Sequence, residues 1–313
     1  MDITNGRNMV IEEIEASRTS FTLYDGSIFI HQGLSYLVKE FNADMHYAKV
    51  LRTDVEYTTS QRDFTDVDPV EIEMIRSLGK ESDVPVYFGK IKTTIKVFGF
   101  FKIDKFGKVI DAVETYNPAI HLLSKGLWID IPKKAMDIVE QKNLCMSAGV
   151  HAAQHCLISC LPQYIVAGVD EVQTECKAPE KEFAGRQTAR VRPARLVFYD
   201  SRGGSYGSGL SIKAFEHIDE VLNQCLEKLQ ECDCKIGCPN CGAAVPFCKE
   251  GNLVISKPAC LIIIAVLLGK DTPDFIDGVE DGPEDNLPEI KVETVKPIDD
   301  HVKFAPDFKI VNI

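Results

Sequence analysis

The segment that decides how the second half of this chain folds is Cys232-Asp-Cys-Lys-Ile-Gly-Cys-Pro-Asn-Cys-Gly-Ala-Ala-Val-Pro-Phe-Cys248. It holds five of the eleven cysteines of the chain. Cys238 and Cys241 frame a Cys-Pro-Asn-Cys turn, which brings two thiolates close enough to bind one metal ion. Zinc takes four ligands in a tetrahedron, and thiolates at these spacings supply them. The segment therefore predicts a structural zinc site, with buried or disulfide-bonded cysteines as the alternative.

Four of the five cysteines suffice for such a site. Cys234, Cys238 and Cys241 are the firmest predicted ligands, and Cys232 and Cys248 compete for the fourth position. No N-terminal segment combines a basic start, an apolar run and a small-residue cleavage site, so we expect no signal peptide. A chain kept in a reducing compartment retains free thiols, and this expectation favours zinc over disulfides.

Composition limits the size of the core and the range of partners. A chain of 313 residues can bury one large core or two modest ones, and its 45% hydrophobic and 26% charged residues are typical of a globular protein. The longest apolar run, Ala259 to Leu268, is shorter than the roughly 20 residues that cross a bilayer, so it predicts a buried helix or strand and no membrane partner. The net charge of −12 argues against strong autonomous binding to nucleic acid, although a local basic patch is compatible with it.

The first part of the chain has the alternating pattern of short strands. After a short helix expected over Asn8–Ser17, turn residues separate segments of period two, which indicates a small barrel or a curled antiparallel sheet. A helix is expected over Asp68–Gly79, with a strand as the alternative. The strand-like segments are Ser20–Tyr24, Ser27–His31, Ser35–Phe41, Tyr47–Arg52, Val55–Thr59, Val86–Phe88, Thr93–Phe101 and Val109–Glu114.

The pattern changes near residue 130, and helices then dominate. The predicted fold class is α+β: a β-rich accessory domain over 1–130, an α/β zinc-binding domain over 131–269, and an acidic tail over 270–313. Ser211 is expected to cap the helix that enters the cysteine segment. The predicted helices are Lys133–Lys142, Ser147–Leu161, 211–230 and 259–268, the last preceded by Lys257-Pro258, and the predicted strands are Tyr164–Val169 and Ala194–Asp200.

Two further groups of residues could carry function. His151 and His155 lie at i and i+4 on one helix face and could hold a metal, but Ala152 stands where a metalloprotease has its glutamate, so core packing is the preferred interpretation. Arg186, Arg190 and Arg192 could contact DNA or a partner, although an exposed loop is the preferred interpretation. The lysines between residues 90 and 108 suggest a solvated sheet face or, alternatively, a phosphate-contacting one.

Several phrases together resemble a known family. They are Gly26-Ser-Ile-Phe-Ile-His-Gln-Gly33, Tyr36-Leu-Val38, Phe64-Thr-Asp-Val-Asp-Pro69, His151-Ala-Ala-Gln-His155, Phe198-Tyr-Asp200 with its Gly-rich follower, and the cysteine segment. As a set they resemble the C-terminal part of the Hrq/MrfA group of superfamily-2 DNA helicases, which ends in an MrfA-type zinc-binding domain. Thr174-Glu-Cys-Lys177 with Lys181-Glu-Phe183 favours the fungal Hrq branch. Many members have Gly-Asn directly after the last cysteine, whereas Lys249 and Glu250 intervene here, which makes Cys232 a better fourth ligand than Cys248.

The resemblance implies an ATP-driven 3′-to-5′ DNA helicase that acts in DNA repair in the nucleus and binds zinc. The sequence contains no phosphate loop of the G-x-x-x-x-G-K-[ST] type, so the ATPase motor is expected in cis or in trans outside these residues, and enzymatic activity of the chain itself stays open. The main hypothesis is therefore a zinc-stabilised accessory region that helps a motor to hold DNA. The alternatives are a protein-interaction module, and a hydrolase that uses His151, His155 and Asp200 on a second metal.

Overall fold

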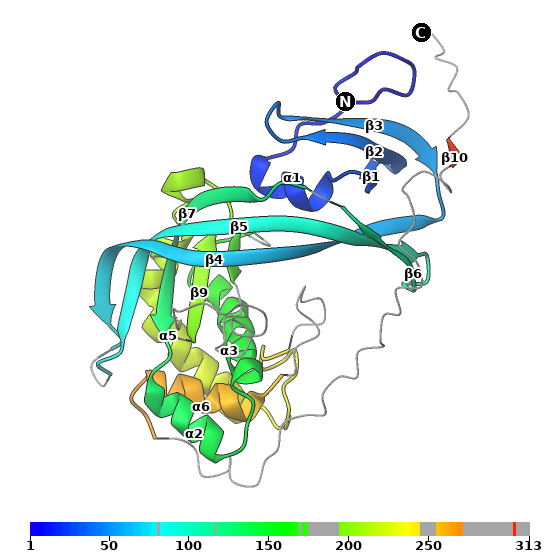
Figure 1. The fold of residues 1–313 in the computed structure, drawn as a ribbon. Coiled ribbons are helices and arrows are strands. Elements are labelled where there is room, and N and C mark those ends of the chain that lie inside the picture. The colour runs from blue at the N-terminus through cyan, green and yellow to red at the C-terminus, as the bar shows by residue number, and fades with distance from the viewer. Residues whose placement is uncertain are drawn as a thin grey trace. The chain divides into compact units, whose positions relative to one another are not determined.

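The fold is that of a computed structural model, which describes residues 1–79, 82–115, 117–168, 171–174, 194–244, 255–271 and 303–304 (Figure 1). The chain divides into two compact units. Unit 1 comprises Met1–Asp66, Thr93–Leu122 and Glu289–Ile313, and unit 2 comprises Val67–Lys92 and Leu123–Pro288. Two long strands, β4 (Tyr57–Ser77) and β5 (Pro85–Asp104), contribute residues to both units.

Unit 1 is built on antiparallel strands. β1 (Ile28–His31) pairs with β2 (Leu34–Asn42), β2 pairs with β3 (Tyr47–Asp54), and β10 (Lys303–Phe304) pairs with β3. The first part of β4, the second part of β5 and β6 (Val109–Glu114) complete the strands of this unit. Over the described residues the sheets are open, so the expected antiparallel sheet is confirmed in its open form rather than as a closed barrel.

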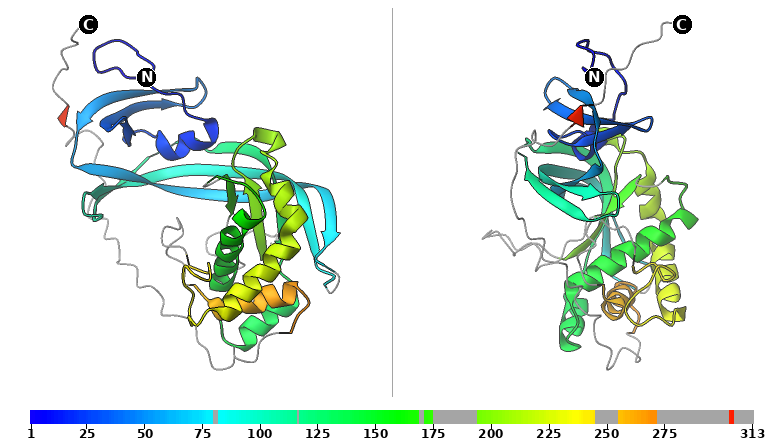
Figure 2. Two further views of the ribbon diagram at one scale, coloured as in Figure 1. Left: turned by 180° about the vertical axis from the view of Figure 1, so that it is seen from behind. Right: turned by 90° about the vertical axis from the view of Figure 1, so that its right-hand side faces the viewer.

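Unit 2 combines a sheet with helices. β7 (Ile120–Asp130) pairs antiparallel with β9 (Arg195–Asp200), which pairs antiparallel with β8 (Val172–Thr174). The helices α3 (Met146–Cys160) and α5 (Leu210–Glu231) both contact β9 (Figure 2). The α+β class expected from the sequence is therefore confirmed.

Helix α6 (Lys257–Leu267) lies at the centre of unit 2. It contacts α3, α5 and α2 (Lys133–Gln141), and each of its eleven residues is buried (Figure 2). A helix that is apolar on all sides is stable in water only when other elements surround it. The expectation of a buried element over Ala259–Leu268 is therefore confirmed, and α6 is the core around which the other helices pack.

The contact between α3 and α6 depends on a small residue. A Cβ atom at Gly149 would lie 2.5 Å from the Cβ atom of Ala259, so the two helices approach closely only because Gly149 has no side chain. We expect Gly149→Val to lower the free energy of unfolding by about 2 kcal/mol, since overpacking forces the two helices apart. Urea unfolding followed by circular dichroism measures the change. Lys134→Val, on the exposed face of α2, controls for the low helix propensity of valine, and equal losses in both variants would contradict the packing argument.

Four segments differ from the sequence-based expectation. The helix expected over Asn8–Ser17 is absent because Met9 forms backbone hydrogen bonds with Asp2. Helix α1 (Ala16–Thr22) instead includes the first residues of the strand expected over Ser20–Tyr24. The helix expected over Asp68–Gly79 is the second part of β4, so the strand alternative was correct. No strand forms over residues 164–168, which follow a short 3-10 helix.

The Gly-rich segment after β9 is ordered by a buried carboxylate. Asp200 accepts backbone N–H hydrogen bonds from Ser208 (2.9 Å), Gly209 (3.1 Å) and Ser211 (2.7 Å), and it is 1% exposed. A Cβ atom at Gly207, whose φ is +71°, would lie 2.4 Å from Asp200 Oδ2. The backbone amides that could have formed a phosphate cradle therefore bind a side chain of the protein itself. Helix α5 begins after Gly209, so the N-cap expected at Ser211 is corrected by two residues.

Candidate metal centre

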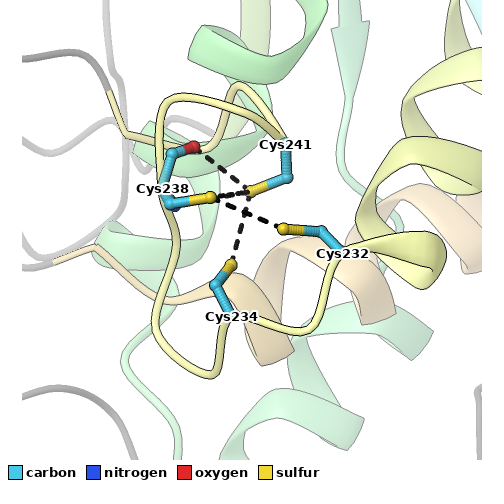
Figure 3. Close-up of side chains that lie close together, drawn as sticks. All are labelled: Cys232, Cys234, Cys238 and Cys241. Atoms are coloured by element: carbon cyan, nitrogen blue, oxygen red, sulfur yellow. Dashed lines mark hydrogen bonds between the residues drawn. The ribbon is translucent and has the colours of Figure 1, made fainter.

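Four cysteines gather directly after α5, where the chain turns back toward the start of α6 (Figure 3). They are Cys232, Cys234, Cys238 and Cys241, and their Sγ atoms all lie within 4.8 Å of one another. The Sγ of Cys238 lies 3.5 Å from that of Cys232 and 3.9 Å from that of Cys241. The Sγ atoms of Cys234 and Cys241 are 3.7 Å apart.

These separations can be compared with the requirements of zinc. In a tetrahedral site with Zn–S bonds of about 2.3 Å, neighbouring sulfur atoms are about 3.8 Å apart. The three measured separations of 3.5, 3.7 and 3.9 Å scatter around this value. Disulfide sulfurs are only about 2.05 Å apart, so the four side chains are arranged as ligands rather than as bonded pairs. The set fits a tetrahedral thiophilic ion.

The backbone between Cys238 and Cys241 shapes the turn. The N–H of Cys238 donates to Cys241 Sγ at 3.4 Å, and the N–H of Gly242 donates to the carbonyl of Pro239 at 3.2 Å. Backbone hydrogen bonding from Cys241 is the main cause that lowers the pKa of Cys238 to about 7, whereas burial raises the pKa of Cys234 to about 12. Amide hydrogen bonds to sulfur favour the thiolate form, which is the form that binds metal.

Lys257 supports the cluster from the first residue of α6. Its Nζ donates to the carbonyl of Cys234 at 2.7 Å and to the carbonyl of Cys232, and the residue is only 5% exposed. Its backbone N–H donates to the carbonyl of Ile236 at 2.7 Å. A buried ammonium group bound to the carbonyls of two of the cysteines offsets one of the two negative charges that a Zn(Cys)₄ site would carry. Lys257 thus holds the loop by hydrogen bonds and complements the charge of the cluster.

We expect Lys257→Met to weaken zinc binding while the four cysteines stay in place. Losing a partner around the ligands of a metal typically lowers affinity about 10–100-fold. Competition with a chromophoric zinc chelator measures this change. Lys270→Met is the matched control, because Lys270 is exposed and its Nζ donates to Asn223 instead. Equal affinities of the Lys257→Met variant and the unaltered chain would contradict the role assigned to Lys257.

The other predicted site residues are placed as follows. Cys248, Arg186, Arg190 and Arg192 lie outside the described residues. The Nε2 atoms of His151 and His155 approach to 2.7 Å, so the predicted face-sharing of the pair is present. Asp200 does not join them: among the described residues, the groups able to hold a metal consist of cysteines alone. The carboxylate of Asp200 binds backbone amides instead, so the residues of the proposed hydrolase site are not brought together.

A second group of cysteines was missed in the sequence. Cys156 and Cys160 on α3 and Cys225 on α5 also have Sγ atoms within 4.8 Å of one another, and all three are buried. The i, i+4 spacing of Cys156 and Cys160 on a predicted helix was a usable signal. Cys225 could not be assigned to them, because only the packing of α5 against α3 brings it near.

Comparison with known proteins connects the cluster to a family. Residues 153–242 match the MrfA Zn-binding domain. The chain is 64% identical over all of its length to the ATP-dependent helicase HRQ1 of Saccharomyces cerevisiae, and covers 29% of that protein. Over its whole length the chain resembles the Hrq/MrfA group. The Schizosaccharomyces pombe ATP-dependent helicase hrq1 is 37% identical over 91% of the chain, which covers 27% of it. The resemblance inferred from the sequence phrases is therefore confirmed.

A solved structure supports the fold of the chain. The DUF1998 helicase MrfA bound to DNA matches 84% of the chain with a TM-score of 0.57 and 20% identity, and the match covers 33% of that structure. The chain thus spans about a third or less of the relatives and the structure that it matches. Among the described helices, none combines the length and apolar character needed to span a bilayer.

Proposed function

We propose that the chain is the zinc-binding accessory region of an ATP-dependent 3′-to-5′ DNA helicase that acts in DNA repair. The observation that carries the proposal is the four-cysteine centre, which lies at the end of a segment that matches the MrfA Zn-binding domain. The phosphate-loop pattern does not occur in the 313 residues, so a motor in cis or in trans supplies ATP hydrolysis. A nuclear location accords with this role.

In this proposal zinc is structural. Cys232, Cys234, Cys238 and Cys241 close the coordination shell, so no position is left for a substrate water. The ion, when bound, links the loop after α5 into one rigid unit. Lys257 connects this loop to α6 by hydrogen bonds, and α6 fills the core of unit 2. The bound ion would therefore stabilise the helical core as well as the loop. The centre would stabilise the region without taking part in chemistry.

One face of β5 in unit 1 has the features of a DNA contact. Lys96 and Phe98 are exposed on it, and the guanidinium of Arg62 lies 5.0 Å from the ring centroid of Phe98 and 5.1 Å from that of Phe101. Cations bind phosphates, and exposed aromatic rings stack on unpaired bases. We define Arg62, Lys96 and Phe98 as the β5 face and propose that it contacts a single strand of DNA.

We expect Lys96→Glu to lower the affinity of the chain for a labelled single-stranded oligonucleotide at low salt. Loss of one phosphate contact should also reduce the slope of log K against log salt concentration by about one. Fluorescence anisotropy at several salt concentrations measures both quantities. Lys133→Glu, on the exposed surface of α2, makes the same charge change away from the β5 face. Equal losses in both variants would show a nonspecific charge effect and would contradict the assignment.

Arg186, Arg190 and Arg192 are a second proposed DNA contact. A triple glutamine variant tests it in the same titration, with weaker binding as the expected result.

The same titration of the unaltered chain separates the main proposal from a protein-interaction module. If the unaltered chain does not bind the oligonucleotide even at low salt, the interaction module becomes the better account of this region. The acidic composition of the chain makes this a demanding test, because the net charge of −12 opposes binding.

A further inference from the structure

The helical core of unit 2 contains a second set of converging thiols. Cys156 and Cys160 lie one turn apart on α3, and Cys225 faces them from α5. Their Sγ atoms are mutually within 4.8 Å, and each residue is 0% exposed. We call this set the core thiol cluster. Cys225 lies 69 residues after Cys156 in the sequence, so only the packing of the two helices brings the sulfur atoms together.

Buried cysteines often act as small apolar residues, so the convergence of the three thiols is compared with a buried cysteine that belongs to neither group. Cys260 on α6 provides this comparison: the residue is also 0% exposed, but it is not a member of either cysteine group. The core thiol cluster has polar surroundings in addition. The Sγ of Cys156 lies 3.3 Å from the carbonyl oxygen of Cys241, and Ser159 Oγ lies 4.0 Å from Cys160 Sγ. A purely apolar pocket would lack these groups.

We propose that Cys156, Cys160 and Cys225 form a second metal site, which takes one divalent, thiophilic ion of the zinc and cadmium class. Thiolate sulfur selects soft ions, and a set of three supplies most of the shell that such an ion requires. On binding, the three thiols release three protons to solvent and three metal–sulfur bonds form. No electron is transferred, so the step needs no oxidant or reductant.

Charge decides between ion classes at this buried position. A monovalent ion with three thiolates carries two negative charges, whereas a divalent ion leaves one. Lys228 follows Cys225 by three residues on α5, so its charge lies on the same side of the helix and can balance one negative charge but not two. The surroundings therefore favour a divalent ion.

Cadmium is the probe for this site, since its bonds to thiolate absorb in the ultraviolet. The complete chain, freed of metal under reducing conditions, is titrated with Cd²⁺, and bound metal is counted after gel filtration. We expect two ions per chain for the unaltered protein and one for Cys225→Ala. Cys145→Ala, which removes an exposed cysteine outside both groups, should retain two. Cys238→Ser should lose only the ion of the four-cysteine centre when the count is made below the melting temperature of the variant, so the two sites fail separately.

Saturation of the unaltered chain at one ion, or retention of two ions by Cys225→Ala, would overturn the proposal. X-ray absorption provides a second measurement, which needs no variant and so does not depend on whether Cys225→Ala folds. In the chain loaded to saturation, a mean sulfur coordination number between three and four indicates a four-thiolate site together with a three-thiolate site. A mean of four, with one ion bound, would leave the core thiol cluster as a packing feature only.

Discussion

Cys238→Ser will abolish stoichiometric zinc binding by the four-cysteine centre and melt unit 2 at a much lower temperature than the unaltered chain. Structural zinc sites contribute apparent free energies of about 10–16 kcal/mol, which equals or exceeds the total stability of a typical domain of about 5–15 kcal/mol. The Sγ of Cys238 approaches those of two other ligands, Cys232 and Cys241. Metal analysis and thermal melting followed by circular dichroism measure the two effects.

The matched control is Cys145→Ser, which removes a thiol that is exposed and belongs to neither cysteine group. This variant should bind zinc and melt as the unaltered chain does. Chelation of the unaltered chain should reproduce the effect of Cys238→Ser without any change of sequence. A metal-free chain that keeps the original melting transition would refute a structural role for zinc.

Asp200→Ala should be the second most damaging change, with a loss of about 4 kcal/mol in the free energy of unfolding. The substitution leaves the N–H groups of Ser208, Gly209 and Ser211 without their acceptor, and the buried donor of Ser211 alone costs about 1–3 kcal/mol. It also removes a negative charge from the start of α5, where the helix dipole favours one. Urea unfolding gives the free energy directly.

Two further variants make this test specific. Asp137→Ala removes an exposed aspartate from α2 and should change stability by less than about 0.5 kcal/mol. Asp200→Asn keeps one oxygen acceptor but loses the charge. We therefore expect its loss in the free energy of unfolding to lie between those of Asp200→Ala and Asp137→Ala. If Asp200→Ala and Asp137→Ala were equally stable, Asp200 would not organise the Gly-rich segment.

Features set by local sequence were predictable, and those set by distant contacts were not. The spacing of Cys234, Cys238 and Cys241 predicted their convergence because a short turn determines it, and the apolar run over α6 predicted burial because no exposed helix tolerates it. The second part of β4 was misjudged because Pro69 and Gly79 resemble helix boundaries. Its pairing with β5 overrides that local preference, and the backbones approach so closely that a Cβ atom at Gly89 would lie 2.0 Å from the carbonyl oxygen of Glu71.

The residues of the candidate metal centre fall into the same two classes, those set by local sequence and those set by distant contacts. Cys232 was one of two candidates for the fourth ligand, and the structure brings it to the other three, whereas Cys248 lies outside the described residues. Lys257 was invisible in the sequence as a partner of the cysteines, because its role arises from the return of the chain to the start of α6. The core thiol cluster was hidden for the same reason.

The position of α6 in the chain affects the order of events during synthesis. A ribosome adds about 5–20 residues per second, so α6 follows the four-cysteine loop by an interval on the order of seconds. During that time α3 and α5 are already made, but the apolar faces that will enclose α6 have no partner. A nascent chain in this state exposes the surface that chaperones bind. Zinc bound early by the loop would shorten the time for which these apolar faces are exposed. The carbonyls of Cys232 and Cys234 would already be in place when Lys257 is synthesised, so α6 could pack at once.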